Sequence, residues 1–230
     1  MKNSDGPSHI SIIPDGNRRW ARSKGFEASY GHLKGGDYEH VRSLFLEAKE
    51  SGVKYVSMWA FSTENWSRLK REKDAIFGLI SDSIEKFRKD ASKDGIRFWH
   101  IGRKDRLPND IISHLSKLEK ETENFKELNV LLCLDYGGRD EIIRAVNKAI
   151  KSGLNEVDES KFSEFLDTYN IPDVDLIIRT GGEKRSSGFM PFQSVYSELY
   201  FSETHFPDFD TRELRKAIED FRNRKRNFGR

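Results

Sequence analysis

The sequence contains almost no cysteine and no long hydrophobic run. Its only cysteine, Cys133, lies in the apolar segment NVLLCL, so neither a disulfide nor a cysteine-based metal site can form within one chain. No stretch approaches the roughly 18 apolar residues of a membrane-spanning helix. The N-terminal MKNSDGPSH has no apolar signal-peptide core. We therefore expect a soluble, cytoplasmic protein, and peripheral attachment to a membrane stays open.

An excess of one charge is also lacking. The 40 lysines and arginines are balanced by 38 acidic residues, which leaves a net charge of +2. This balance gives no general argument for nucleic acid, so we expect no nucleic-acid partner. The P-loop pattern G-x-x-x-x-G-K-[ST] is absent, and a nucleotide site of that type is not supported. With 230 residues, 36% of them hydrophobic, the chain can bury one core, and we expect a single domain over residues 1–230.

Short apolar runs alternate with helical patterns along the whole chain. The runs rich in β-forming residues lie at 9–13, 54–61, 96–102, 129–134, 174–178 and 198–202. Apolar residues at helical spacing occupy 37–51, 73–94, 140–151 and 211–224, and Pro108 opens a further helix. This order predicts an α/β fold with a central, mostly parallel six-stranded sheet and helices on both faces.

The loops after several predicted strands share a composition. They combine small or amide residues with arginine: DGNRR after the first run, STENWSR after the second, DYGGR after the fourth and RTGGEKRSS after the fifth. Ligands of parallel sheets bind beyond the carboxyl ends of the strands, and arginine matches phosphate oxygens. The sequence therefore predicts a site for an anionic, diphosphate-like ligand, with Asp15 suggesting a metal. These loops alone also permit a diphosphate hydrolase, and D-G-N alone also marks an ordinary turn.

Six motifs in order resemble those of the cis-prenyltransferases, the undecaprenyl diphosphate synthase family: DGNRRW, YGHLKGG, FSTENWSR, DYGGRDEI, RTGGEKRSS and SELYFSETHFPDF. The resemblance spans His9 to Gly229. It implies an α/β fold with a hydrophobic tunnel, a requirement for Mg²⁺, and a homodimer. It further implies a prenyltransferase that condenses an allylic prenyl diphosphate with isopentenyl diphosphate into a cis polyprenyl diphosphate. Bulky side chains such as Phe87 favour a product of short or medium length.

The resemblance also implies residue roles. Asp15, Asn17 and Asn65 would be catalytic, with Asp15 binding Mg²⁺, Asn17 on a proton path, and Glu198 as a further metal ligand in the dimer. The implied substrate-binding residues are Gly16, Arg18, Arg19, Trp20, His32, Ser62, Trp66, Arg68, Arg179, Arg185 and Ser187. The implied tunnel lining comes from the second strand and the 73–94 helix: Met58, Trp59, Ala60, Ile76, Leu79, Ile80, Ile84 and Phe87.

The chain departs from the family pattern close to the diphosphate positions. Ala28 stands where arginine is usual and Arg18 where glycine is common, while Gly181 and Gly188 replace a serine and an asparagine. The tail NFG at 227–229 replaces an arginine-containing segment. Two alternatives therefore stay open. One is the same ionisation chemistry with another acceptor such as dimethylallyl diphosphate. The other is a regulatory subunit of a heteromeric prenyltransferase. The apolar segment 189–201 supports dimerisation and is equally consistent with core packing.

Overall fold

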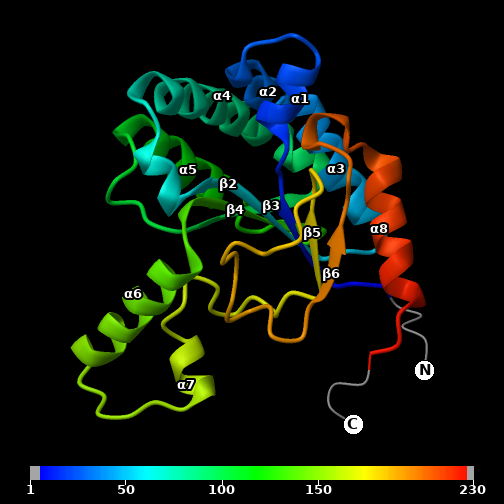
Figure 1. Ribbon diagram of the computed structural model, residues 1–230. Helices are drawn as coiled ribbons and strands as arrows, with labels where there is room; N and C mark the ends of the chain where they lie inside the picture. Colours follow the sequence, from blue (N-terminus) through cyan, green and yellow to red (C-terminus); the bar gives the residue numbers. More distant parts are fainter. Residues whose placement is uncertain (1–5, 227–230) are drawn as a thin grey trace.

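Six parallel strands form one sheet in the order β3-β4-β2-β1-β5-β6 in the computed structural model, which describes residues 6–226 (Figure 1). The strands are β1 His9–Ile13, β2 Tyr55–Ser62, β3 Ile96–Ile101, β4 Leu128–Tyr136, β5 Leu176–Arg179 and β6 Glu198–Phe201. Each predicted run overlaps one of them, so the predicted parallel sheet is confirmed. The runs are nearly continuous in apolar residues because the central strands are covered on both faces.

Four helices cover one face of the sheet and enclose the main core. They are α3 Tyr38–Glu50, α4 Lys70–Asp94, α5 Asn109–Thr122 and α8 Thr211–Asn223. Asp37 and Asp210 cap the N-termini of α3 and α8 through backbone N–H groups, and Gly95 ends α4 in the left-handed conformation. Phe45 and Phe87 pack together in this core with ring centroids 5.6 Å apart. The predicted helical periodicity is therefore confirmed on this side.

The opposite face differs from the prediction that helices flank both sides. Its buried cluster joins Leu131 and Ile177 of the strands to Phe189 and Met190, which belong to the loop between β5 and β6. Helices α6 (Gly138–Lys151) and α7 (Glu159–Ser163) lie to one side of the sheet (Figure 1). The apolar pattern at 140–151 correctly indicates a helix. Its hydrophobic stripe nevertheless lies outside this core, because side chains such as that of Ile150 remain 64% exposed.

Two short helices after β1, α1 (Asn17–Ser23) and α2 (Ala28–Gly35), replace the simple turn that D-G-N suggested. They pack closely because α2 carries two glycines against α1. A Cβ atom at Gly31 would lie 1.9 Å from the Asn17 carbonyl oxygen. A Cβ atom at Gly35 would lie 2.1 Å from Asn17 Oδ1. Two 3₁₀ turns, η1 (Thr63–Ser67) and η2 (Phe206–Asp208), complete the described chain, and none of its helices is long and apolar enough to cross a bilayer.

The close approach of α1 and α2 predicts opposite effects of one substitution at two helical glycines. Gly78→Ala in α4 meets open space, so the gain in helix propensity should stabilise the protein by about 0.5–1 kcal/mol. Gly31→Ala forces backbone atoms apart and should destabilise it by about 1–3 kcal/mol. Urea unfolding midpoints measure both effects. Equal shifts in the two variants would contradict the packing described.

Candidate functional site

A cavity of about 490 Å³ lies between the sheet and helices α2, α3 and α4. Its polar end is formed largely by residues at or just beyond the carboxyl ends of the strands and by His32 of α2: Asp15, Asn17, His32, Ser62, Glu64, Asn65, Arg68, Arg179 and Ser187. Its interior is apolar and includes Val41, Met58, Trp59, Ala60, Ile76, Leu79, Ile80, Ile84, Phe87, Leu132 and Leu134. All eight side chains that we predicted for a tunnel belong to this lining. The cavity therefore combines a place for a charged group with room for a hydrocarbon chain.

Asp15 and Arg179 face each other at the polar end. Arg179 ends β5 and donates from Nη2 to Asp15 Oδ2 at 2.8 Å, while the Gly16 N–H donates to Asp15 Oδ1 at 2.6 Å. Burial acts to raise the pKa of Asp15, but the hydrogen bonds from Arg179 and Gly16 outweigh it and hold that pKa below its usual range. The carboxylate is therefore ionised at neutral pH. Gly16 is needed here because its φ is 94° and a Cβ atom would lie 2.5 Å from the His205 ring.

Arg179 is buried and fixed from several sides. Its Nη1 donates to Ser187 Oγ at 2.8 Å and to the Arg185 carbonyl oxygen at 2.7 Å. Its Nε–H is buried without a hydrogen-bond partner among the described residues. Unpaired buried donors are rare in proteins, so this N–H is suited to an acceptor oxygen of a ligand.

Thr180 is a site residue that the sequence reasoning missed. The Asp15 N–H donates to Thr180 Oγ1 at 2.9 Å, and Thr180 Oγ1 donates to the Asp15 carbonyl oxygen at 2.7 Å. The hydroxyl thus holds the Asp15 backbone from the neighbouring strand. Gly181 follows with φ at 82°, and its added Cβ would lie 3.0 Å from the Gly16 Cα. The RTGG motif contains Thr180 and Gly181, but the sequence does not show that they contact the backbone of Asp15 and Gly16.

Asn17 begins α1, belongs to the cavity lining and has an unused acceptor beside Gly35 of α2. Its Nδ2 donates to the Pro14 carbonyl oxygen at 2.8 Å, which sets the orientation of the amide. Its Oδ1 is buried and has no partner within residues 6–226. A buried amide oxygen in this state can accept a hydrogen bond from a water or a ligand, which agrees with the expected place on a proton path.

The loop after β2 brings Asn65 and Arg68 to the cavity. Asn65 Oδ1 accepts from the Ser62 N–H at 3.1 Å, as part of a reciprocal cap of η1. Arg68 Nη1 donates to Glu72 Oε1 at 3.2 Å and lies 3.3 Å from His32 Nε2. Burial, and then the charge of Arg68, lower the pKa of His32 to about 4. The imidazole is therefore neutral at pH 7 and can donate or accept a hydrogen bond.

Several predicted substrate-binding residues lie outside the cavity lining. Trp20 is buried next to Tyr30 and Phe26, and its indole takes no part in the lining. Trp66 packs its ring into the main core and does not line the cavity either. Both tryptophans therefore lie outside the cavity lining, and direct substrate contact stays a prediction for them. Motif position did not reveal this because an indole can serve a core as well as a ligand.

Three predicted arginines lie at the rim of the site and not in its lining. Arg19 lies 3.7 Å from Asp15 and 3.4 Å from Glu183, and Arg185 pairs with the same Glu183 at 2.5 Å. Arg18 is exposed and carries its charge close enough to Arg68 and His32 to lower their pKa values. These side chains add positive potential around the polar end.

Glu198 does not join Asp15 within this chain. It begins β6 beside Leu176, the first residue of β5, whereas Arg179 ends that strand. Its carboxylate pairs with Arg224 at 2.9 Å. A role for Glu198 at the metal would therefore involve the partner chain of the dimer, as the resemblance implies, and that assignment stays a prediction.

The described residues contain no group of three or more His, Cys, Asp or Glu side chains arranged to hold a metal. Mg²⁺ is often bound by one or two carboxylates, with water and substrate phosphates as its other ligands. Asp15, an ionised carboxylate beside donors suited to phosphate, fits that kind of site. The expected change in the tail, at 227–229, lies outside the described residues.

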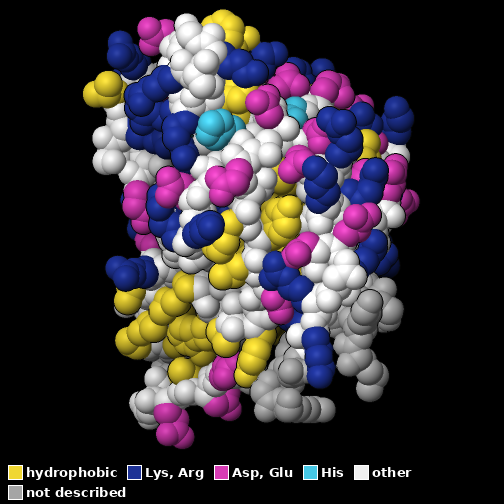
Figure 2. All heavy atoms as spheres, turned by 45° about the vertical axis from the view of Figure 1, so that its right-hand side comes forward, with side chains coloured by type: hydrophobic (Ala, Val, Ile, Leu, Met, Phe, Trp, Pro, Cys, Tyr) yellow, Lys and Arg dark blue, Asp and Glu magenta, His cyan; other side chains and the backbone are white. Residues whose placement is uncertain are grey.

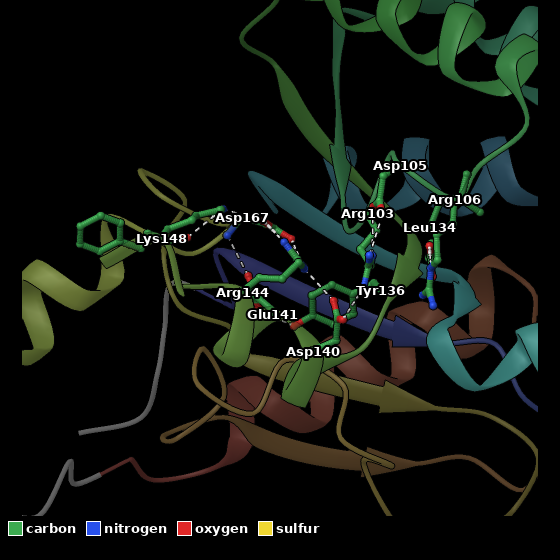
Figure 3. A network of polar contacts seen from close by, with 12 residues as sticks. Arg103, Asp105, Arg106, Leu134, Tyr136, Asp140, Glu141, Arg144, Lys148 and Asp167 are labelled. Carbon is green, nitrogen blue, oxygen red and sulfur yellow. Dashed lines mark hydrogen bonds and ion pairs between the residues drawn. The ribbon is translucent and has the colours of Figure 1, made fainter. Parts of the chain in front are cut away.

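The fourth predicted loop, Asp135 to Arg139, does not add an arginine to the cavity. Its arginine, Arg139, is exposed outside the lining. The neighbouring Arg103, which follows β3, is also engaged elsewhere, since it pairs with Asp105 at 2.6 Å and with Asp140 at 3.3 Å. Figure 3 shows Arg103, Asp105 and Asp140 as part of a polar network at the start of α6. In it, Arg144 joins Asp140 to Asp167. Arg139 of this loop therefore lies outside the cavity lining, while Asp140 connects α6 to its neighbours.

Comparisons with known proteins agree with this geometry. Residues 13–229 match the prenyltransferase family model, which describes an undecaprenyl diphosphate synthase. An isoprenyl transferase of Aquifex pyrophilus is 46% identical over 97% of this chain and 96% of its own length. One of Fusobacterium nucleatum is 43% identical over 97% and 96%.

Two solved structures are also similar. Lavandulyl diphosphate synthase from Lavandula x intermedia, in complex with dimethylallyl diphosphate, has a TM-score of 0.92 and 34% identity, covering 98% of this chain and 99% of its own. A probable undecaprenyl diphosphate synthase from Campylobacter jejuni has a TM-score of 0.83 and 35% identity, covering 97% and 99%.

The parallel sheet, the arginine-containing loops at its carboxyl edge and the apolar cavity, together with these comparisons, define an enzyme that transfers prenyl groups. The chain belongs to the undecaprenyl diphosphate synthase family of prenyltransferases. The family resemblance and the fold inferred from sequence are thereby confirmed.

The low pKa of His32 gives a direct prediction. Its imidazole should titrate near pH 4 instead of 6.5, because charging it means burying a cation beside Arg68. The folded pKa lies below that of the unfolded chain, so protonation between those values favours unfolding, and this residue should make the protein less stable as pH falls through that interval. Inorganic diphosphate should raise the pKa by offsetting the charge of Arg68. NMR titration of labelled histidine measures both, and a midpoint near 6.5 without ligand would contradict the burial described.

Proposed function

We propose that the enzyme condenses an allylic prenyl diphosphate with isopentenyl diphosphate, with Mg²⁺ as cofactor, and that it forms a cis polyprenyl diphosphate of short or medium length. The observation that carries this proposal is the continuity of the cavity. A buried arginine and an ionised aspartate occupy one end, and aliphatic and aromatic side chains line the rest. We also propose that the whole chain forms one catalytic domain. We place the enzyme in the cytoplasm with peripheral contact to a membrane.

The residues at the polar end suit each stage of such a reaction. When the carbon–oxygen bond of the allylic substrate breaks, a delocalised cation and a diphosphate anion form. Arg179 and the N–H groups near Gly16 can stabilise the anion. The alkene of the acceptor then forms the new carbon–carbon bond, and one proton leaves to the diphosphate or to a water held by Asn17 Oδ1. Mg²⁺ held by Asp15 would supply further neutralisation of diphosphate charge.

The acceptor deserves a direct test because a second candidate has structural support. The similar lavandulyl diphosphate synthase was solved with dimethylallyl diphosphate, and this chain departs from the family pattern at Ala28 and Arg18. The departure at Gly181 has a different explanation. Its backbone is in the left-handed region, where glycine is favoured, so this glycine is not evidence for a changed acceptor. We therefore favour isopentenyl diphosphate.

With Mg²⁺ and farnesyl diphosphate, the purified enzyme should form longer products with isopentenyl diphosphate and none with dimethylallyl diphosphate. Asp15→Asn should lower turnover by about 10²–10³-fold, the scale of losing one charge-stabilising group. Asp105→Asn, which also removes a carboxylate paired with arginine, should leave it unchanged. Mass spectrometry and NMR identify the products. Products with dimethylallyl diphosphate would favour the second candidate, and no product in any tube would favour the regulatory subunit.

Phe87 should limit product length. Among the lining residues of α4 it lies farthest along the helix from Arg68, so it lies deepest in the cavity. Phe87→Leu should lengthen the product, and Ser83→Phe, which fills the cavity nearer its polar end, should shorten it. Phe221→Leu removes the same volume from a buried site in α8 and should not change the length. Thin-layer chromatography measures the products, and unchanged lengths in both Phe87→Leu and Ser83→Phe would contradict the assignment.

We further propose a homodimer formed through the exposed stripe of α6 and the segment 195–199, which runs into the start of β6. Large hydrophobic side chains remain exposed there, namely Ile143, Val146, Ile150, Val195, Tyr196 and Leu199. Figure 2 shows hydrophobic side chains gathered on the lower part of one face of the molecule. A single chain rarely exposes so broad an apolar area without a partner. Of the segment we considered, Phe189 is instead buried in the core.

Ile150→Asp tests this interface because it places a charge within the proposed contact. The variant should sediment as a monomer at concentrations where the parent is a dimer. Its circular dichroism should match that of the parent, because Ile150 is exposed in the single chain. A parent protein that is monomeric throughout would contradict the proposal.

A further inference from the structure

Asp135 is a buried carboxylate that the proposed reaction does not use. It lies near the end of β4, is fully buried, and has a left-handed backbone with φ at 52°. The Arg106 guanidinium donates from Nε to Oδ2 at 2.9 Å and contacts Oδ1 through Nη2. The indole N–H of Trp66 donates to the same Oδ1 at 2.8 Å. A buried charge is costly without partners, so this arrangement requires both of them.

Trp66 connects this carboxylate to the site. It lies in η1 directly after Asn65 and two residues before Arg68, both of which line the cavity. Its ring packs against Phe61 and Phe77 at 5.5 and 5.6 Å between centroids. The Arg106 guanidinium lies 5.4 Å from the same ring, so one arginine contacts both members of the hydrogen-bonded pair.

The other attachments of η1 are weaker or local. The cap between Ser62 and Asn65 joins two residues of the same turn. Arg68 contacts Glu72 and His32, which are only partly buried. The Lys73 ammonium donates to the Trp66 carbonyl oxygen at 3.0 Å from the first turns of α4. Among the described residues, the part-buried hydrogen bond from Trp66 to Asp135 is therefore the direct side-chain link between η1 and β4.

We propose that Asp135, held by Arg106, is a positioning residue that fixes Asn65 and Arg68 through the indole of Trp66. Its effect on turnover rests on the proposed prenyl transfer, whereas its effect on the loop does not. Small displacements of catalytic groups have large kinetic effects, since a shift of about 1 Å can reduce a rate about 10²-fold. The part played by Trp66 in catalysis is then indirect, which explains its position outside the lining.

Two variants separate the parts of this arrangement. Asp135→Asn keeps an oxygen for Trp66 but removes the charge that Arg106 holds, and Trp66→Phe keeps the ring but removes its N–H. Two variants elsewhere serve as matched controls, because each removes an interaction of the same kind at another place. Trp99→Phe removes an indole hydrogen bond to Asn129 with an arginine over the ring. Asp94→Asn removes a buried carboxylate held by two bonds from Arg42.

Hydrogen exchange of the full purified chain, read by mass spectrometry, tests the link without any turnover. Amides of residues 63–68 should exchange about tenfold faster in Asp135→Asn and in Trp66→Phe than in the parent, as expected when local opening becomes easier. The two controls should leave that segment unchanged. Parent-like exchange at 63–68 in Trp66→Phe would overturn the proposal, whether or not Asp135→Asn folds.

Kinetics then test whether the link serves the reaction. Asp135→Asn and Trp66→Phe should lower kcat/KM by about 10–100-fold, and the controls should not. Combined with Asn65→Ala and Arg68→Ala together, Asp135→Asn should cause little further loss, because it acts through residues already removed. Losses that multiply would show a general structural effect and overturn the positioning role. A parent enzyme without turnover would overturn the proposed function instead, and hydrogen exchange would still decide the link.

Discussion

The ion pair between Asp15 and Arg179 connects the ends of β1 and β5, and the other features of the site depend on it. Asp15 is ionised because Arg179 and the Gly16 N–H outweigh the cost of its burial. Arg179 in turn is oriented by Ser187 and by the carbonyl oxygen of Arg185. The result is a buried positive group with one N–H that has no partner within residues 6–226, beside a carboxylate that can share a cation with phosphate oxygens.

The architecture explains why this polar pair lies next to an apolar cavity. Parallel strands bring their following loops to one end of the sheet, so β1, β2 and β5 supply Asp15, Asn65 and Arg179 to the same place. The amphipathic α4 crosses one face and contributes its apolar side to the interior. A substrate with a charged head and a hydrocarbon chain matches this arrangement in both parts.

The strands and the main residues of the polar end could be inferred from sequence because each has a local signal. Apolar runs indicated the strands. The rule that ligands bind beyond the carboxyl ends of parallel strands placed Asp15 and Arg179 at the same site. The helices α1 and α2 had no comparable signal, since α2 contains Gly31 and Gly35, which disfavour helix and are needed for close packing.

Other features could not be predicted from the sequence, because they depend on contacts between distant parts of the chain. The stripe at 140–151 has the correct period, but periodicity does not tell a core from a surface between two chains. The motif FSTENWSR placed Trp66 beside Asn65, but only the fold shows that its indole binds Asp135. The resemblance implies Glu198 as a metal ligand only in the dimer, and only the structure shows that within one chain its register places it beside Leu176.

We propose that one cavity holds both the diphosphate and the growing chain. A crystal structure with Mg²⁺ and a non-reactive thio analogue of farnesyl diphosphate tests it most directly. We expect the diphosphate to contact Arg179 or the Gly16 N–H beside Asp15, with the farnesyl chain between the sheet and α4 toward Phe87. A diphosphate bound away from Asp15, or a farnesyl chain lying outside this cavity, would contradict that proposal.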